Sequence, residues 1–500
     1  MAWVKEQAVQ NRWNLGLAAL LALCILRLWL APLSQSFWVD EMVTVFVVHQ
    51  GPHDPSFADA PQVPKSIYYA VARLADAIFG VSEVGYRIPS LIFAAIALFL
   101  IARLAARLIH PEAGWFAVFA CLALKSFNTE ASDARPYALG FCVVAASFVF
   151  LAQWLDSARW TDALGFVFFA ALVWRVHLIF WPLYLAFATY TIVRLLRKET
   201  SVGWPQACAV FALIGLTLAP VLAEALPILR HAGAHVIVEP PSVRELVDSL
   251  KWKLVLTCLG GAAIMARILH RTPDHAALAW SSVTLIAGWW LIDPVALFGF
   301  SWLTGNSVFV NRYLSIALPG AALAATFAVA LVLTRPNWKL TAALLGAGVL
   351  ITLGHWSGPL RANSDWRAAA RAVSESTLTA DTPVICPSPF VEARYPVWRP
   401  DYPLPGFLYA HLSVYGFSGR KYLFPFASSP EAEQYAAKLC QDLLPASRRF
   451  LLYGGDVNVH RWRDWLARRP ELAGWTQKSL GSFGDVDVVE FDRSPVTNQP

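Results

Sequence analysis

The stretch IPSLIFAAIALFLIARLAARLI, residues 88–109, decides the fold class of this chain. It is a long apolar run without an acidic residue, and its only charges, Arg103 and Arg107, come near its end. A helix of this length crosses the ~30 Å hydrocarbon core of a membrane. Because the cytoplasmic ends of spans are rich in Lys and Arg, these arginines predict that this end is cytoplasmic.

The same pattern recurs over the first 356 residues, and the whole chain is 57% hydrophobic and only 15% charged. Such a composition excludes an ordinary soluble protein and predicts a polytopic membrane protein, mainly α-helical. The formal charge of +6 comes without a Lys/Arg-rich tract, so we expect no nucleic-acid partner. We expect about eleven transmembrane helices and a cytoplasmic N-terminus, with spans near 15–33, 88–109, 112–128, 136–155, 160–175, 178–196, 204–222, 251–269, 276–296, 314–334 and 339–356.

The composition changes near residue 358, after which charged and turn residues become common. Candidate strands at 382–388, 449–454 and 485–492 alternate with helical patterns at 365–377, 430–443 and 458–468, which is typical of a small α/β domain. We therefore expect a transmembrane domain at 1–358 that includes an extracytoplasmic first loop at 34–87, an extracytoplasmic α/β domain at 359–493 and a disordered tail at 494–500.

The expected first loop contains the acidic pair Asp40-Glu41, in FWVDEM, and the apolar run SIYYAVARLADAIFG, residues 66–80. If that run crossed the membrane, Arg103 would lie outside, against the positive-inside rule. We therefore expect it to lie at the membrane interface as an amphipathic helix. Two interpretations of the acidic pair stay open: a general base with its helper, or an ordinary helix start that favours acids.

Further polar residues come from other connections on the same predicted face. SFNTEASDARPYAL holds Arg135 and Tyr137, and FVNRYLSIALPG holds Arg312 and Tyr313, while His177 lies between two later spans. Each residue alone is more often a snorkelling anchor than a site residue. Together, several cations and two acids are suited to transfer of a group from a lipid phosphate, because arginine binds phosphate bidentately.

Cysteines and cofactor motifs give weaker signals. Five of the seven cysteines fall in apolar spans, while Cys386 and Cys440 fall in the α/β domain, where a disulfide and two separate buried thiols are both open interpretations. No His/Cys group has metal-ligand spacing, so no cofactor is required and a divalent cation has no support. The absence of GxGxxG and Walker motifs argues against a nucleotide-driven pump.

The ordered segments FWVDEM, SIYYAVARLADAIFGVSEVGYRIPSLIFAAIALFLIARLAARL, ASDARPYAL and NRYLSIALPG resemble the membrane glycosyltransferases of the GT-C fold. The nearest group is similar to the dolichyl-phosphate-mannose protein mannosyltransferase superfamily, which includes bacterial aminoarabinose transferases. The resemblance implies that a sugar moves, with inversion, from a polyprenyl phosphate to an extracytoplasmic acceptor that is a lipid, a glycan or a protein. It also implies a place in the bacterial inner membrane, among membrane lipids.

The resemblance also implies roles for individual residues. Asp40 would be the base that activates the acceptor, and Glu41 would orient the acceptor or the base. Arg135 and Tyr137 would bind the donor phosphate, and Arg312 and Tyr313 would support that phosphate and the cavity.

The chain departs from the family pattern at VPKSIYYA. Lys65 stands where members commonly carry a His-Pro-Pro or similar motif, so it either contacts phosphate or only snorkels. Two rival classes stay open. A transporter or flippase of lipid-linked sugars predicts internal repeats, and we see none in the sequence. A non-catalytic scaffold leaves the acids and arginines unexplained.

Overall fold

The computed structural model describes residues 2–230, 239–268, 279–333, 337–353, 364–377 and 379–493. The chain divides into two compact units. The helical unit comprises Met1–Leu33, Lys65–Ile78 and Val84–Leu360, and the mixed unit comprises Ser34–Pro64, Phe79–Glu83 and Arg361–Pro500. The predicted tail at 494–500 lies outside the described residues.

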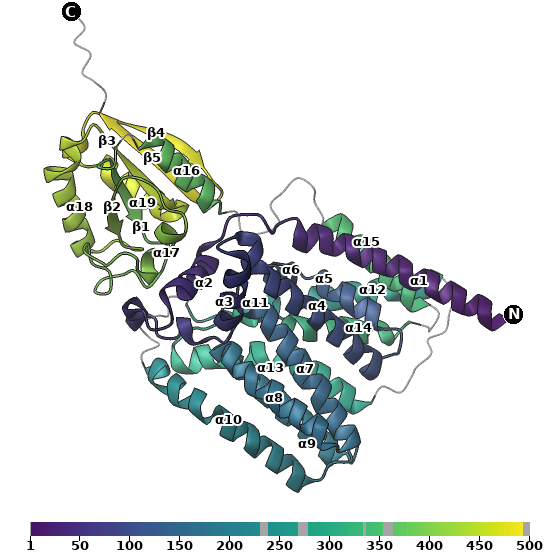
Figure 1. Cartoon of the computed structure of the whole chain (residues 1–500). Coiled ribbons are helices and arrows are strands. Elements are labelled where there is room, and N and C mark those ends of the chain that lie inside the picture. Colours follow the sequence, from purple (N-terminus) through teal and green to yellow (C-terminus); the bar gives the residue numbers. More distant parts are fainter. Residues whose placement is uncertain are drawn as a thin grey trace, which may run out of the picture. The chain divides into compact units, whose positions relative to one another are not determined.

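The helical unit is a bundle of long apolar helices (Figure 1). Its helices are α1 (Ala2–Ile25), α3 (Tyr68–Phe79), α4 (Glu83–Leu108), α5 (Gly114–Leu122), α6 (Lys125–Ala131), α7 (Tyr137–Ser157), α8 (Trp160–Val176), α9 (Leu183–Leu196), α10 (Trp204–Arg230), α11 (Val243–Ser249), α12 (Trp252–Ile268), α13 (Trp280–Thr304), α14 (Leu318–Ala330) and α15 (Trp338–Thr352). Short turns of helix, η1 (Leu26–Leu30), η3 (Val63–Lys65), η4 (Leu178–Phe180) and η6 (Tyr313–Ala317), extend or precede some of them.

The number of helices that are long and apolar enough to span, counted over the described residues, differs from the eleven spans expected. Among the described residues, seven helices are long and apolar enough to cross a membrane, or eight if the bent pair α11 and α12 forms one span. The expected span at 112–128 is instead two short helices, α5 and α6. Between them Leu124 has an extended backbone, and Asn128 Nδ2 donates to the carbonyl of Leu122 at 2.7 Å, which satisfies an oxygen that the end of α5 leaves without a helical partner.

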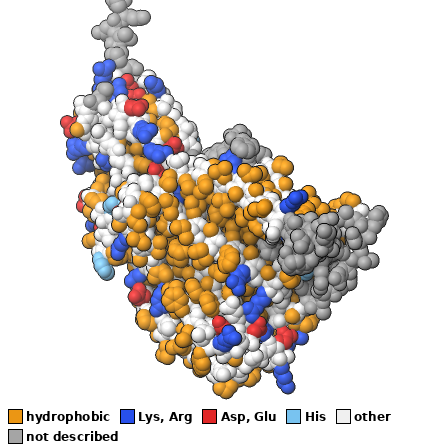
Figure 2. All heavy atoms as spheres, turned by 45° about the vertical axis from the view of Figure 1, so that its right-hand side comes forward, with side chains coloured by type: hydrophobic (Ala, Val, Ile, Leu, Met, Phe, Trp, Pro, Cys, Tyr) orange, Lys and Arg blue, Asp and Glu red, His pale blue; other side chains and the backbone are white. Residues whose placement is uncertain are grey.

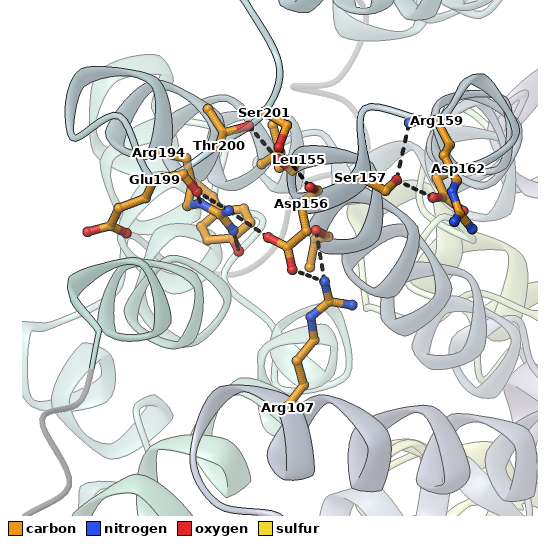
Figure 3. Close-up of polar contacts among 12 residues, drawn as sticks. Arg107, Leu155, Asp156, Ser157, Arg159, Asp162, Arg194, Glu199, Thr200 and Ser201 are labelled. Atoms are coloured by element: carbon orange, nitrogen blue, oxygen red, sulfur yellow. Dashed lines mark hydrogen bonds and ion pairs between the residues drawn. The ribbon is translucent and has the colours of Figure 1, made fainter.

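A charged cluster joins the C-terminal ends of three helices in the bundle (Figure 3). Asp156, at the end of α7, accepts hydrogen bonds from Arg107 of α4 and from Arg194 of α9, the latter at 2.6 Å. Arg194 also donates to the hydroxyl of Tyr190 at 3.0 Å. These contacts place the arginine-rich ends of α4 and α9 together, as the sequence predicts for ends on one side of the membrane.

The mixed unit is built on a five-stranded sheet of order β2-β1-β3-β5-β4. Its strands are β1 (Pro383–Pro387), β2 (Arg420–Phe424), β3 (Arg449–Gly455), β4 (Trp475–Ser482) and β5 (Val486–Arg493). β1 is parallel to β2 and β3, and β5 is antiparallel to β3 and β4. The helices of this unit are α2 (Val39–Gln50), α16 (Trp366–Ser376), α17 (Ala410–Val414), α18 (Pro430–Asp442) and α19 (Asp456–Ala467), with 3-10 turns η2 (Pro55–Asp59), η8 (Phe407–Tyr409), η9 (Leu444–Ala446) and η10 (Pro470–Leu472).

The first loop packs inside the mixed unit, a grouping that differs from the expected division of domains. The backbone N–H of Phe407 donates to the hydroxyl of Ser56 at 3.0 Å, and the rings of Phe57 and Phe407 lie 5.8 Å apart. The guanidinium of Arg367 pairs with Glu83 at 3.1 Å. Residues 34–64 therefore share the core of the C-terminal segment.

Of the two interpretations of Cys386 and Cys440, the structure has the separate thiols. Both cysteines are free and buried.

Candidate functional site

Three connections of the helical unit build a cluster of arginines and aromatic rings. Arg135 and Pro136 precede α7, and proline suits this place because its fixed φ fits the start of a helix and it has no N–H to satisfy. His177 follows α8 in an extended conformation and caps η4. Arg312 is the residue just before η6, which begins at Tyr313.

The imidazole of His177 lies at the centre of this cluster. Its ring stacks on Tyr137 with centroids 5.9 Å apart and is tilted against Tyr313 at 5.2 Å. The guanidinium carbon of Arg312 is 5.4 Å from the centroid of the Tyr313 ring, a cation–π distance. Four of the residues singled out in the sequence, Arg135, Tyr137, Arg312 and Tyr313, therefore surround a histidine that the sequence did not assign to the site.

Burial, together with the charges of two arginines, keeps His177 neutral. Burial lowers the pKa of its imidazole from 6.5 to about 3, and the positive charges of Arg135 and Arg312 act in the same direction. At neutral pH both arginines are therefore positively charged and the ring of His177 is uncharged, while the carboxylate of Glu130 lies close enough to act on Tyr137.

The tautomer of His177 follows from its hydrogen bond. The backbone N–H of Ile179 donates to Nδ1 at 3.3 Å, so Nδ1 is an acceptor and the proton is assigned to Nε2. The cluster can thus offer guanidinium donors and one neutral N–H donor to the same anion. Arginine forks and a short neutral donor suit a phosphate.

Lys65 belongs to a segment that runs beside His177. The hydroxyl of Ser66 donates to the carbonyl of Val176 at 2.6 Å, and the N–H of Ile67 donates to the carbonyl of Arg175 at 3.0 Å. The ammonium of Lys65 pairs with Glu224 of α10 at 3.0 Å, and both side chains are largely exposed. An exposed pair of this kind contributes little to stability, so a phosphate can compete for Lys65.

The acidic pair lies in the mixed unit, in the first turn of α2. The carboxylate of Glu41 accepts the backbone N–H of Trp38 at 3.3 Å, which is the half of a capping box that a glutamate at this position supplies. The helix-start interpretation therefore accounts for at least part of the role of Glu41. Asp40 stands one residue earlier in the same turn.

Two further observations limit the site. Arg175, two residues before His177, donates to the carbonyls of Ala171 and Thr217 at 2.6 and 2.5 Å, so it ties α8 to α10. Within the described part of the chain, no group of three or more His, Cys, Asp or Glu residues could hold a metal ion. The sequence already placed His177 between two apolar helices at the same end as ARPY and RY, but it assigned no role to this residue.

The helical bundle, its mixed C-terminal unit and its arginine cluster agree with the class that the sequence resembles, the membrane glycosyltransferases of the GT-C fold. A family model described as dolichyl-phosphate-mannose-protein mannosyltransferase matches residues 64–223, which include Lys65, Arg135 and His177. A search of curated proteins finds no match.

Two solved structures are similar to this chain over nearly its whole length. The apo structure of ArnT from Cupriavidus metallidurans has a TM-score of 0.55 at 13% identity and covers 97% of this chain and 98% of its own. The structure of the same protein bound to undecaprenyl phosphate has a TM-score of 0.54 at 11% identity, with coverages of 95% and 97%. The predicted fold is thus confirmed: a multi-pass integral membrane protein with the GT-C fold.

Proposed function

We propose that this chain is a membrane glycosyltransferase that moves a sugar from a polyprenyl-phosphate donor to an extracytoplasmic acceptor. The observation that carries the proposal is the placement of Arg135 and Arg312 around a neutral His177. The family match over residues 64–223 and the likeness to a protein solved with undecaprenyl phosphate support the same function. These matches do not favour a transporter or flippase.

In the proposed mechanism, Arg135, Arg312 and Lys65 bind the donor phosphate, while Tyr137 and Tyr313 fix the orientation of His177 through their rings. The acceptor hydroxyl attacks the anomeric carbon, a new O–C bond forms, and the bond from that carbon to the phosphate oxygen breaks. The leaving polyprenyl phosphate carries negative charge, so positioned cations can stabilise it without a general acid.

Asp40 is proposed as the base that takes the proton of the attacking hydroxyl, with Glu41 orienting it. Inversion follows from a single displacement. The proposed place is the bacterial inner membrane, with the N-terminus in the cytoplasm and the mixed unit outside, as the arginine-rich helix ends favour. The acceptor is a lipid, a glycan or a protein.

The test is sugar transfer by the purified full-length protein in proteoliposomes, with radiolabelled polyprenyl-phosphate sugars and total membrane lipids. We expect a labelled acceptor and free polyprenyl phosphate. Asp40→Asn should abolish transfer without loss of membrane insertion, and Arg135→Ala should raise the apparent KM for the donor. Arg103→Ala is the matched control. Arg103 packs over Phe99 near the C-terminal end of α4, whereas the start of α4 contacts Arg135 through Ser90.

Two results would remove this proposal. If labelled donor crossed the membrane intact and no acceptor became labelled, the chain would be a flippase. Full transfer by the Asp40→Asn protein would exclude Asp40 as the base.

A further inference from the structure

A cavity of about 520 Å³ in the helical unit lies among α1, α4, α5 and α15. Its walls are mostly apolar, from residues such as Leu21 and Ile25 of α1, Leu98 of α4 and Val118 of α5. Asn14, Glu112 and Lys339 also line it. The cavity is therefore an apolar groove with charged groups in its wall, a composition typical of a site for an amphipathic molecule.

The charged groups lie at one end of the groove. Asn14 and Ile25 are eleven positions apart on α1, which corresponds to about 16 Å along a helix. Glu112 follows the C-terminal end of α4 and Lys339 lies in the first turn of α15. The length of about 16 Å between Asn14 and Ile25 is roughly half of a ~30 Å hydrocarbon core, so the groove spans the depth of one leaflet.

The groove is remote from the arginine cluster. Ser90, near the start of α4, donates to the carbonyl of Arg135 at 3.5 Å, whereas Glu112 lies just beyond Leu108, the last residue of α4. The 18 positions from Ser90 to Leu108 correspond to about 27 Å. The polar end of the groove is therefore at the opposite end of α4 from the proposed sugar-transfer site.

Apolar side chains beside the groove face outward. Leu15 and Leu23 of α1 are 71% and 51% exposed, and Phe99 of α4 is 60% exposed. Figure 2 shows hydrophobic side chains gathered over the surface of the helical unit. In a membrane protein such side chains contact acyl chains, so the groove is open to lipid rather than to water.

The two charges at the polar end select the headgroup. Lys339 is only 8% exposed, which is rare for lysine, and it lies close enough to Glu112 for their charges to attract. A headgroup with one negative and one positive charge would satisfy both, with its phosphate at Lys339 and its ammonium at Glu112. An anionic headgroup alone would be repelled by Glu112.

We propose that this groove binds one acyl chain of a zwitterionic phospholipid with a primary ammonium headgroup, with Lys339 at its phosphate and Glu112 at its ammonium. The site rests on the charges and depth of the groove and not on the proposed sugar transfer. A primary ammonium is preferred to a trimethylated one because only the former donates hydrogen bonds to a carboxylate.

The test is native mass spectrometry of the full-length protein from nanodiscs that contain phosphatidylethanolamine, phosphatidylcholine or phosphatidylglycerol. We expect bound phosphatidylethanolamine to exceed the other two by roughly tenfold, the effect of one charge-assisted hydrogen bond. Glu112→Gln should abolish this preference. Ala95→Trp fills the groove and should remove bound lipid, while Ile96→Trp, on the same helix but outside the groove, should retain it.

Other outcomes overturn the proposal. Equal lipid on the Ala95→Trp and Ile96→Trp proteins would mean that the groove holds no lipid. Equal binding of all three lipids would mean that Glu112 and Lys339 pair only with each other. A preference for phosphatidylglycerol would mean that Lys339 selects the headgroup without Glu112. Sugar transfer by Glu112→Gln is measured in parallel, so failure of this site and failure of the proposed function give different results.

Discussion

The neutral His177 offers the sharpest test of the proposed phosphate site, because two substitutions separate its two nitrogens. In His177→Asn, the amide oxygen can still accept the N–H of Ile179, as Nδ1 does at 3.3 Å, but the donor at the Nε2 position is lost. In His177→Gln, the longer side chain places an N–H₂ donor near the former Nε2. If Nε2–H binds the donor phosphate, Gln should restore what Asn removes.

The magnitude follows from the kind of bond that is lost. A hydrogen bond to a charged group contributes about 1.5–3 kcal/mol, and each 1.4 kcal/mol is a factor of ten. We therefore expect His177→Asn to lower kcat/KM for the polyprenyl-phosphate donor by roughly 10- to 100-fold, and His177→Gln to recover at least half of that loss in logarithmic terms. The rings of Tyr137 and Tyr313 lose stacking in both variants, so stacking alone cannot explain a difference between them.

The assay is donor-dependent transfer across pH 5.5–8, with melting temperatures of both variants as folding controls. Since burial and the two arginines hold the pKa of His177 near 3, its protonation should not appear in the wild-type profile. Equal activity of wild type and His177→Asn would refute the role of Nε2. A wild-type activity that rises with protonation near pH 6.5, and that His177→Asn removes, would mean that the ring acts as a cation.

Two more predictions concern packing and pH. Burial lowers the pKa of His411 to about 3, and its ring lies 4.9 Å from that of Trp366. Between pH 6.5 and 3 only the unfolded chain gains this proton, so the stability of the mixed unit should be full above pH 6.5 and fall as the pH drops toward 3. His411→Phe should flatten this fall when resistance to limited proteolysis of the full-length protein is measured, and an unchanged slope would exclude His411. Gly320→Ala should lower the melting temperature of the protein, since a Cβ there would meet the backbone nitrogen of Trp290 at 2.6 Å and overpacking costs about 1–3 kcal/mol. Gly348→Ala is the matched control, because a Cβ there meets nothing within 4 Å. Equal shifts in melting temperature would mean that the close contact at Gly320 has no effect on stability.

The sequence predicted the elements that local patterns determine. In the mixed unit, β1, β3 and β5 are buried, apolar strands and were expected at nearly their observed bounds. β4, which is largely exposed and reads TQKS in its centre, gave no such signal, because it forms a strand only by pairing with β5 at the edge of the sheet. Apolar length alone also could not show that the stretch 112–128 breaks at Leu124, where Asn128 satisfies the carbonyl of Leu122.

The residues of the arginine cluster were named from the sequence in part, for a related reason. Arg135, Tyr137, Arg312 and Tyr313 were singled out by their motifs, and the structure brings their neighbourhoods together around His177. His177 has no motif of its own, and its importance comes from the burial and charges that only the folded chain supplies. The grouping of residues 34–64 with the C-terminal segment was likewise invisible, since it depends on contacts such as Phe57 with Phe407, 350 positions apart.

The residues of the arginine cluster lie where the helices are interrupted. Arg135 lies between α6 and α7, His177 lies between α8 and η4, and Arg312 precedes η6, so each contributes from a point where regular helix stops. Within a membrane, irregular backbone is tolerated only where protein buries it or where it lines a cavity, because lipid cannot satisfy its N–H and C=O groups. Three such points around one imidazole therefore mark a polar site. Asn128 satisfies irregular backbone in the same way, because its Nδ2 donates to the carbonyls of Leu122 and Leu124 between α5 and α6.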